Sequence, residues 1–405
     1  MKIENIRALE ILDSRGNPTV QAEAVLSDGT RATAQVPSGA STGRHEAVER
    51  RDGGARYCGK GVLDAVRNVE TVLKPAVVGL DADDQSGLDR RLIETDGTNG
   101  KRRLGANAVL AVSCAVARAA AQSLRLPLWK YLAGTRSPVL PAPMVNIVSG
   151  GLHAGFNLEF QDFLVIPRGY GSLAEALEAV VQVHRTAGRL FSERGCILTG
   201  VADEGGWGPQ LTSNEQAVAV VRNAINAAGA AMDIALDIAA THFFEDGYYA
   251  LEGSLVSAEG MTELLADWIP RYGIRSIEDP LAEDDWDGWR AITRDLGGSV
   301  RLVGDDLFAT NLERLNRGIE SKAANAVLVK MNQIGTLTET FAVIDRALDA
   351  GYGAVISARS GETEDSFLAD LAVASGAGQI KIGSVTRSER LAKYNRLLEI
   401  EKWEL

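Results

Sequence analysis

The segment Ile274-Arg275-Ser276-Ile277-Glu278 has the composition of a short buried strand that ends in a carboxylate. Similar apolar segments, each followed by turn residues, lie at residues 233–237, 301–305, 326–330, 354–358 and 379–381. The later strands end at residues 278, 305, 330, 358 and 381. This repeat of about 25 residues is the length of one strand, one helix and two loops, which predicts a parallel βα barrel. An open doubly wound sheet is the alternative, but no Gly-rich dinucleotide fingerprint follows the first of these strands.

The first forty residues have a different pattern. Val20, Ala22, Ala24 and Leu26 alternate on one face before a turn at residues 27–29, which predicts a hairpin or a small antiparallel sheet. Helical spacing dominates residues 105–132 and ends at a Pro-rich segment, residues 137–143. We therefore predict an α/β protein with an N-terminal α+β domain, residues 1–136, and a βα barrel, residues 137–405.

Composition limits the partners. The 405 residues are 45% hydrophobic and 24% charged, which is typical of globular domains. A net charge of −12 without a long Lys/Arg run disfavours nucleic acid and anionic membranes as partners, although a small anionic substrate in a local basic pocket fits. The apolar run at residues 106–124 contains polar residues and predicts a buried helix, not a membrane span. No signal peptide is recognisable, so we expect a cytoplasmic protein.

Three consecutive predicted strands end in the acids Asp237, Glu278 and Asp305. Each acid alone could simply cap the following helix. Together they would converge at the carboxyl ends of adjacent strands and repel one another unless a cation lay between them. A ligand set made only of oxygen atoms favours Mg²⁺, with Mn²⁺ as a substitute.

Lys330 ends the next strand, close to that predicted cation. Burial and a neighbouring positive charge both lower the pKa of a lysine, so Lys330 could act as a base that removes a proton next to a carboxylate. The metal would stabilise the resulting enediolate. The alternative is a lysine in a surface salt bridge.

Two Gly-rich segments precede the repeats. Residues 38–43 could form a mobile loop that closes over a ligand, or a plain turn. Residues 203–207 place Glu204 before two glycines at a predicted strand end, where it could serve as a general acid, although a turn is again the alternative.

Together with other motifs, these segments resemble the enolase family along nearly the whole chain. The motifs are Asp13-Ser14-Arg15-Gly16-Asn17-Pro18, the Ser38 loop, Gly150-Gly151-Leu152-His153-Ala154-Gly155, the Asp203 segment, Leu236-Asp237, Glu278-Asp279-Pro280, Asp305-Asp306-Leu307, Lys330-Met331-Asn332-Gln333, Arg359-Ser360-Gly361-Glu362-Thr363-Glu364 and Arg387-Ser388-Glu389-Arg390. The resemblance implies a modified barrel that opens with two strands and two helices, and a homodimer.

The resemblance also implies roles for individual residues. Lys330 would remove the C2 proton, and Glu204 would assist departure of the C3 hydroxyl. A first Mg²⁺ would be held by Asp237, Glu278 and Asp305, and a second, arriving with substrate, by Ser38. The expected substrate-binding residues are His153, Gln161, Asp162, Lys330, Arg359, Ser360 and Lys381. Arg359 suits a phosphate because its planar donors can bind two oxygens.

Three departures from the family pattern lie at the expected site. Ala358 replaces a histidine, Asp162 replaces a glutamate, and Thr241-His242 replaces Ser-Glu. Loss of an imidazole contact costs about 1–3 kcal/mol of hydrogen bonding. We therefore hypothesise a secondary-metabolism paralogue, resembling carboxyphosphonoenolpyruvate synthase, that acts on a small phosphono-carboxylate. The alternatives are an ordinary glycolytic enolase acting on the phospho-carboxylate 2-phosphoglycerate, and a weakly active binding or scaffold protein.

Overall fold

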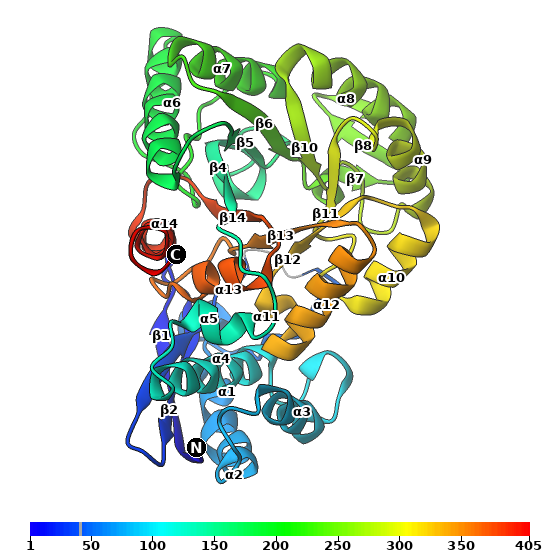
Figure 1. The fold of residues 1–405 in the computed structure, drawn as a ribbon. Helices are drawn as coiled ribbons and strands as arrows, with labels where there is room; N and C mark the ends of the chain where they lie inside the picture. Colours follow the sequence, from blue (N-terminus) through cyan, green and yellow to red (C-terminus); the bar gives the residue numbers. More distant parts are fainter. Residues whose placement is uncertain (40–42) are drawn as a thin grey trace.

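The computed structural model describes residues 1–39 and 43–405, which form a small N-terminal lobe and a large barrel (Figure 1). The lobe contains an antiparallel sheet in the order β1-β2-β3, formed by Ile3–Leu12, Pro18–Leu26 and Arg31–Gln35. Its helices are α1 (Leu63–Asn68), α2 (Lys74–Val77), α3 (Gln85–Asp96), α4 (Ala106–Ser123) and α5 (Leu128–Ala133). Because α4 packs on β2 and β3, Val20, Ala22, Ala24 and Leu26 are all buried, as their alternation predicts. The helical stretch predicted at residues 105–132 is two helices, with Pro127 directly before α5.

The barrel is closed in the order β4-β5-β6-β10-β11-β12-β13-β14. Its strands are β4 (Ala142–Ser149), β5 (Asp162–Pro167), β6 (Met232–Asp237), β10 (Ile274–Glu278), β11 (Arg301–Gly304), β12 (Ala326–Val329), β13 (Gly353–Ser357) and β14 (Gln379–Gly383). The β5 strand is antiparallel to both neighbours, whereas the other pairs are parallel. The closed barrel is therefore confirmed, and the open doubly wound sheet is wrong.

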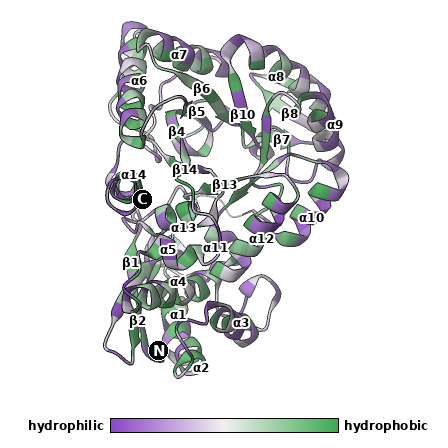
Figure 2. Cartoon of the chain, in the orientation of Figure 1, coloured by the Kyte–Doolittle hydropathy of each residue, from purple (hydrophilic) through white to green (hydrophobic). Residues whose placement is uncertain are grey.

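Two helices follow the first two barrel strands, as the family resemblance implies. The outer helices are α6 (Leu173–Glu193), α7 (Asn214–Ala227), α8 (Ala258–Tyr272), α9 (Trp286–Leu296), α10 (Leu312–Ser321), α11 (Met331–Ile334), α12 (Leu337–Asp349), α13 (Phe367–Ser375) and α14 (Ser388–Glu399). Several of them mix hydrophobic and hydrophilic residues, as expected for helices that cover a barrel (Figure 2). A small sheet of β7 (Phe244–Glu245), β8 (Tyr248–Leu251) and β9 (Ser254–Val256) lies between β6 and α8 in the chain.

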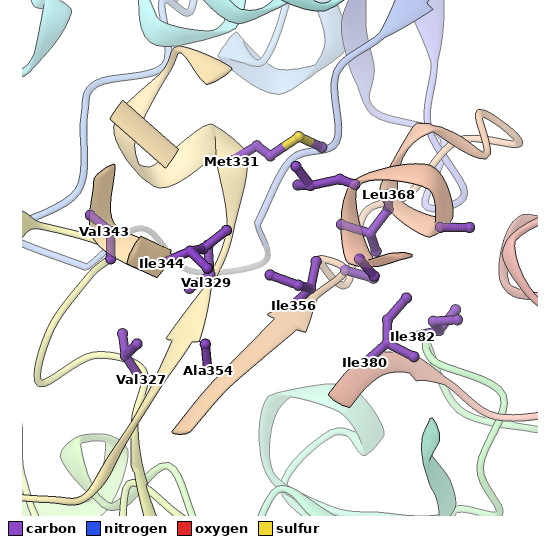
Figure 3. Close-up of a cluster of buried hydrophobic side chains, with 14 of the residues drawn as sticks. Val327, Val329, Met331, Val343, Ile344, Ala354, Ile356, Leu368, Ile380 and Ile382 are labelled. Carbon is purple, nitrogen blue, oxygen red and sulfur yellow. The ribbon is translucent and has the colours of Figure 1, made fainter. Parts of the chain in front are cut away.

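Apolar side chains fill both faces of the barrel wall. Outside it, apolar residues of β12, β13 and β14 lie against apolar residues of α12 and α13 (Figure 3). The strands contribute Val327, Val329, Ile356 and Ile380, and the helices contribute Val343, Ile344 and Leu368. Inside it, a separate buried cluster comprises Met144, Leu164, Ala235, Val303, Ala326, Leu328 and Val355. Because these apolar side chains fill the barrel interior, the charged side chains of the site lie at the ends of the strands.

The N-terminal lobe covers the carboxyl ends of the barrel strands. Ser38 and Gly361 exchange backbone hydrogen bonds of 2.8 and 2.9 Å. Lys101 donates to both carboxylate oxygens of Glu339 at 2.8 and 2.7 Å, so a partly buried ion pair also joins the two parts. A search of the described helices finds none with the length and apolar character needed to cross a bilayer.

Candidate active site

The strand ends bring most of the predicted site residues into one polar cavity beneath the N-terminal lobe. Asp237 and Glu278 are register partners at the ends of β6 and β10, whereas Asp305 and Lys330 directly follow β11 and β12. About 50 Å³ of the cavity is open to water-sized molecules. Its walls include His153, Gln161, Glu204, Asp237, Asp305, Lys330, Arg359, Ser360 and Lys381. Glu278, Asp162 and Ser38 lie behind these walls, each buried.

The predicted metal acids are paired with two lysines. Lys381 Nζ lies 2.6 Å from Asp237 Oδ2 and 2.7 Å from Glu278 Oε2. Lys330 Nζ pairs with Asp305. Gln161 Nε2 donates to Asp237 Oδ2 at 3.2 Å. Asp237 and Glu278 thus meet around the Lys381 ammonium, and a metal held jointly by the three acids stays a prediction.

The acids nevertheless fit a divalent cation. Burial, together with the charge of Asp237, raises the pKa of Glu278 well above its usual range even though Lys381 lowers it, so a further positive charge would favour the ionised carboxylate. Asp305 also belongs to a tight group with Asp279 and Asp306, in which ligand oxygens lie within 4.8 Å of one another. Burial raises the pKa of Asp306 to about 7. A hard cation with oxygen ligands suits such a set.

Lys330 directly follows β12, as predicted, and contacts Asp305. Burial alone would lower the pKa of Lys330, yet the charge of Asp305 outweighs burial and the pKa is raised. The same pair lowers the pKa of Asp305 although burial opposes the change. The lowered pKa supposes a cation beside Lys330 and stays a prediction, whereas the contact with Asp305 is one that the sequence could not show.

Residues 203–206 form a turn and not a strand end, Glu204 lines the cavity, and its role as a general acid stays a prediction. His153 lies between two carboxylates, with Nδ1 2.8 Å from Asp162 Oδ2 and Nε2 3.8 Å from Glu204 Oε1. Burial disfavours a charged imidazole, but these carboxylates outweigh it and raise the pKa of His153 to about 9. Burial would raise the pKa of Glu204 too, whereas His153 and Arg390 lower it. Of these two partners, His153 is therefore the more basic.

Asp162 is completely buried and is held in place by hydrogen bonds. Its Oδ1 accepts from Ser149 Oγ at 3.0 Å and from Asn146 Nδ2, while Oδ2 faces His153. A carboxylate on a side chain shorter by one methylene than that of glutamate is thus still within reach of the imidazole. The replacement noted in the sequence leaves the His–carboxylate pair intact.

Arg359 and Ser360 follow β13 on the wall of the cavity. Arg359 Nη1 donates to Glu46 Oε2 at 2.8 Å and to Asn332 Oδ1 at 3.2 Å. Ser38 Oγ donates to Asp13 Oδ2 at 3.2 Å, near the Gly361 backbone. Residues 40–42 lie outside the described part of the chain, so the predicted closing loop stays a prediction.

Sequence reasoning missed several residues of the cavity. Glu46 comes from the N-terminal lobe and pairs with Arg359, and no local pattern marks it. Asp279 accepts from the backbone nitrogens of Asp305 and Asp306 at 3.0 and 2.7 Å. The paired acids Glu278-Asp279 and Asp305-Asp306 were a sequence signal that could have identified Asp279 as a site residue. His242, which was noted as a departure, lines the same cavity.

Comparison with known proteins fits this geometry. Residues 137–404 match the family model described as the enolase C-terminal TIM barrel domain, and residues 3–132 match the enolase N-terminal domain. The chain belongs to the enolase family. A curated relative named enolase, from Acidothermus cellulolyticus, is 53% identical over 404 residues, covering 99% of this chain and 94% of the relative. The chain is therefore an enzyme of the carbon–oxygen lyase class.

Proposed function

We propose that this enolase-family protein catalyses the Mg²⁺-dependent dehydration of 2-phosphoglycerate to phosphoenolpyruvate. The observation that carries the proposal is that one buried cavity holds Lys330, the carboxylate cluster, the His153–Glu204 pair and Arg359. The similarity to a relative named enolase supports the same reaction over the secondary-metabolism hypothesis.

In this proposal each side chain of the cavity has one task. Arg359 and Ser360 bind the phosphate, and Lys330 accepts the proton from C2. The C3 hydroxyl leaves as water after it takes a proton from the His153–Glu204 pair. Because the pKa of His153 is raised and that of Glu204 is lowered, we assign the transferable proton to the pair and not to Glu204 alone.

The cation has a defined place in this proposal. Asp237, Glu278 and Asp305 would hold the first Mg²⁺, and Ser38 would contribute to a second that arrives with substrate. When bound, the metal would supply positive charge that stabilises the doubly charged enolised carboxylate. It would also offset the charge of Asp305, which otherwise keeps Lys330 protonated.

A direct assay tests the proposal. Purified protein is incubated with 2-phosphoglycerate and Mg²⁺, and phosphoenolpyruvate is measured through a coupled reaction. We expect turnover that EDTA abolishes and excess Mg²⁺ restores. Absence of phosphoenolpyruvate under conditions where the protein is folded would refute the proposed substrate.

Ala358 favours a second candidate function. It lines the cavity directly before Arg359, where the family has a histidine, so the wall carries only a methyl group there. A larger group on the C2 oxygen, such as a carboxyphosphonate, would meet less obstruction at this point. Faster turnover of a phosphono-carboxylate than of 2-phosphoglycerate would favour this candidate over the first.

Activity, location and oligomeric state complete the proposal. The intact cavity supports an active enzyme over a weakly active scaffold. We propose a cytoplasmic homodimer, as the family resemblance implies, and light scattering during size exclusion would measure the mass of the assembly directly.

A further inference from the structure

Arg390 is a charged residue of α14 that the proposed reaction does not use. Its side chain has an exposed fraction of 0%, which places it among the most buried charged groups of the protein. Its nearest carboxylates are Glu389 Oε1, 3.6 Å from Nε, and Glu204 Oε1, 4.0 Å from Nη1. Burial of a guanidinium without a close carboxylate is costly, so its other contacts must explain its position.

Those contacts are backbone carbonyls at the carboxyl ends of two neighbouring strands. Nη1 donates to Arg359 O at 2.6 Å and to Ile382 O at 3.0 Å. Nη2 donates to Ser360 O at 2.7 Å. One planar guanidinium thus fixes the backbone at two places. The first is Arg359 and Ser360, the proposed phosphate-binding residues after β13, and the second is Ile382, which follows Lys381 in β14.

The turn that carries Glu204 meets the same side chain. Ser384 N donates to Glu204 O at 2.8 Å, which ties this turn to the end of β14. At Gly383, with φ +117°, an added Cβ would lie 2.9 Å from both Arg390 Cδ and Glu204 O. Glycine at residue 383 is therefore what lets the arginine stem pass beneath the turn.

We infer that Arg390 is a positioning residue that fixes the Arg359–Ser360 segment and the Glu204 turn relative to one another. Its fork spans three carbonyls from two strand ends, which an ammonium on a lysine stem cannot reproduce because its donors radiate from one atom. Its charge also helps to keep the pKa of Glu204 low, after the larger effect of His153. The inference rests on the proposed function for its kinetic consequence only.

Arg390→Lys tests the fork and Leu397→Ala is the matched control. Leu397 is a fully buried residue of the same helix whose truncation leaves a cavity without touching these carbonyls. Hydrogen exchange is measured by mass spectrometry over residues 357–363 and 202–206, without substrate. In Arg390→Lys we expect exchange in both segments to rise about tenfold or more, because charged hydrogen bonds are lost. In Leu397→Ala we expect no selective rise there.

Kinetics with 2-phosphoglycerate form the second readout. Arg390→Lys should raise KM and lower kcat, whereas Leu397→Ala should lower the melting temperature and leave both constants near wild type. Unchanged exchange in the two segments of a folded Arg390→Lys variant would overturn the inference, as would equal kinetic losses in the control. Should Arg390→Lys not fold, Gly383→Ala displaces the same stem and its exchange pattern decides the matter. If wild-type protein does not turn over 2-phosphoglycerate, the proposed function fails while the exchange measurement still tests Arg390.

Discussion

Lys381 offers a quantitative test of the carboxylate cluster. Its ammonium lies 2.6 Å from Asp237 and 2.7 Å from Glu278, with side-chain exposures of 7%, 3% and 3%. Lys381→Met removes the cation and leaves two buried carboxylates facing each other. Breaking a buried ion pair from one side costs about 3–5 kcal/mol. With an unfolding entropy of about 2.1 cal/mol/K per residue over 405 residues, that loss lowers the melting temperature by about 4–6 °C.

Mg²⁺ should largely reverse this loss in the variant. In the wild type, added Mg²⁺ would compete with the Lys381 ammonium for the carboxylate oxygens of Asp237 and Glu278. In Lys381→Met this competing ammonium is absent. At a Mg²⁺ concentration about 100 times the dissociation constant, binding stabilises the folded state by about 2.7 kcal/mol. The increase in melting temperature between EDTA and Mg²⁺ should therefore be larger in Lys381→Met than in the wild type.

Circular dichroism melts of both proteins in EDTA and in Mg²⁺ measure the effect. Lys393→Met is the control, because Lys393 has a side-chain exposure of 1% and lies 2.8 Å from Glu362, a carboxylate outside the cluster. It should destabilise the fold without gaining sensitivity to Mg²⁺. If Mg²⁺ raises the melting temperature of Lys381→Met no more than that of Lys393→Met, the proposed cation site is wrong.

Three further predictions concern the chemistry. Lys330→Ala should abolish exchange of the C2 proton of 2-phosphoglycerate with deuterated solvent, measured by proton NMR, and continued exchange would mean that another group is the base. Ala358→His should raise kcat/KM for 2-phosphoglycerate about tenfold or more, since a hydrogen bond to a charged group contributes about 1.5–3 kcal/mol; an unchanged value would show that the missing imidazole does not limit the reaction. The pKa of His153 is raised from 6.5 to about 9, so its stabilisation is complete below pH 6.5 and is lost as the pH rises through 9. The free energy of unfolding in urea should fall by up to about 3 kcal/mol over that range, and His153→Gln should flatten the slope.

Local patterns in the sequence determined the barrel and the composition of the site. Alternation and helical spacing depend on residues a few positions apart, so the strands ending near Asp237, Glu278 and Asp305 are visible without a structure. N-caps are equally local: Ser172, Ser213 and Thr336 each stand three residues before a Glu or Gln, and they cap α6, α7 and α12. Residue type alone does not determine burial: Cys114 is buried, whereas Cys58 is exposed and Cys196 is partly exposed.

Only the tertiary structure decided how the charges of the site pair. Lys381 meets Asp237 across 144 positions of sequence, and Arg359 meets Glu46 across 313. Such contacts set the direction of each pKa, because Coulomb interactions depend on distances through space and on burial, neither of which has a local signature. The sequence therefore determined which acids and bases the site contains, whereas the fold decided that Asp305 lies against Lys330 and that His153 lies between Asp162 and Glu204.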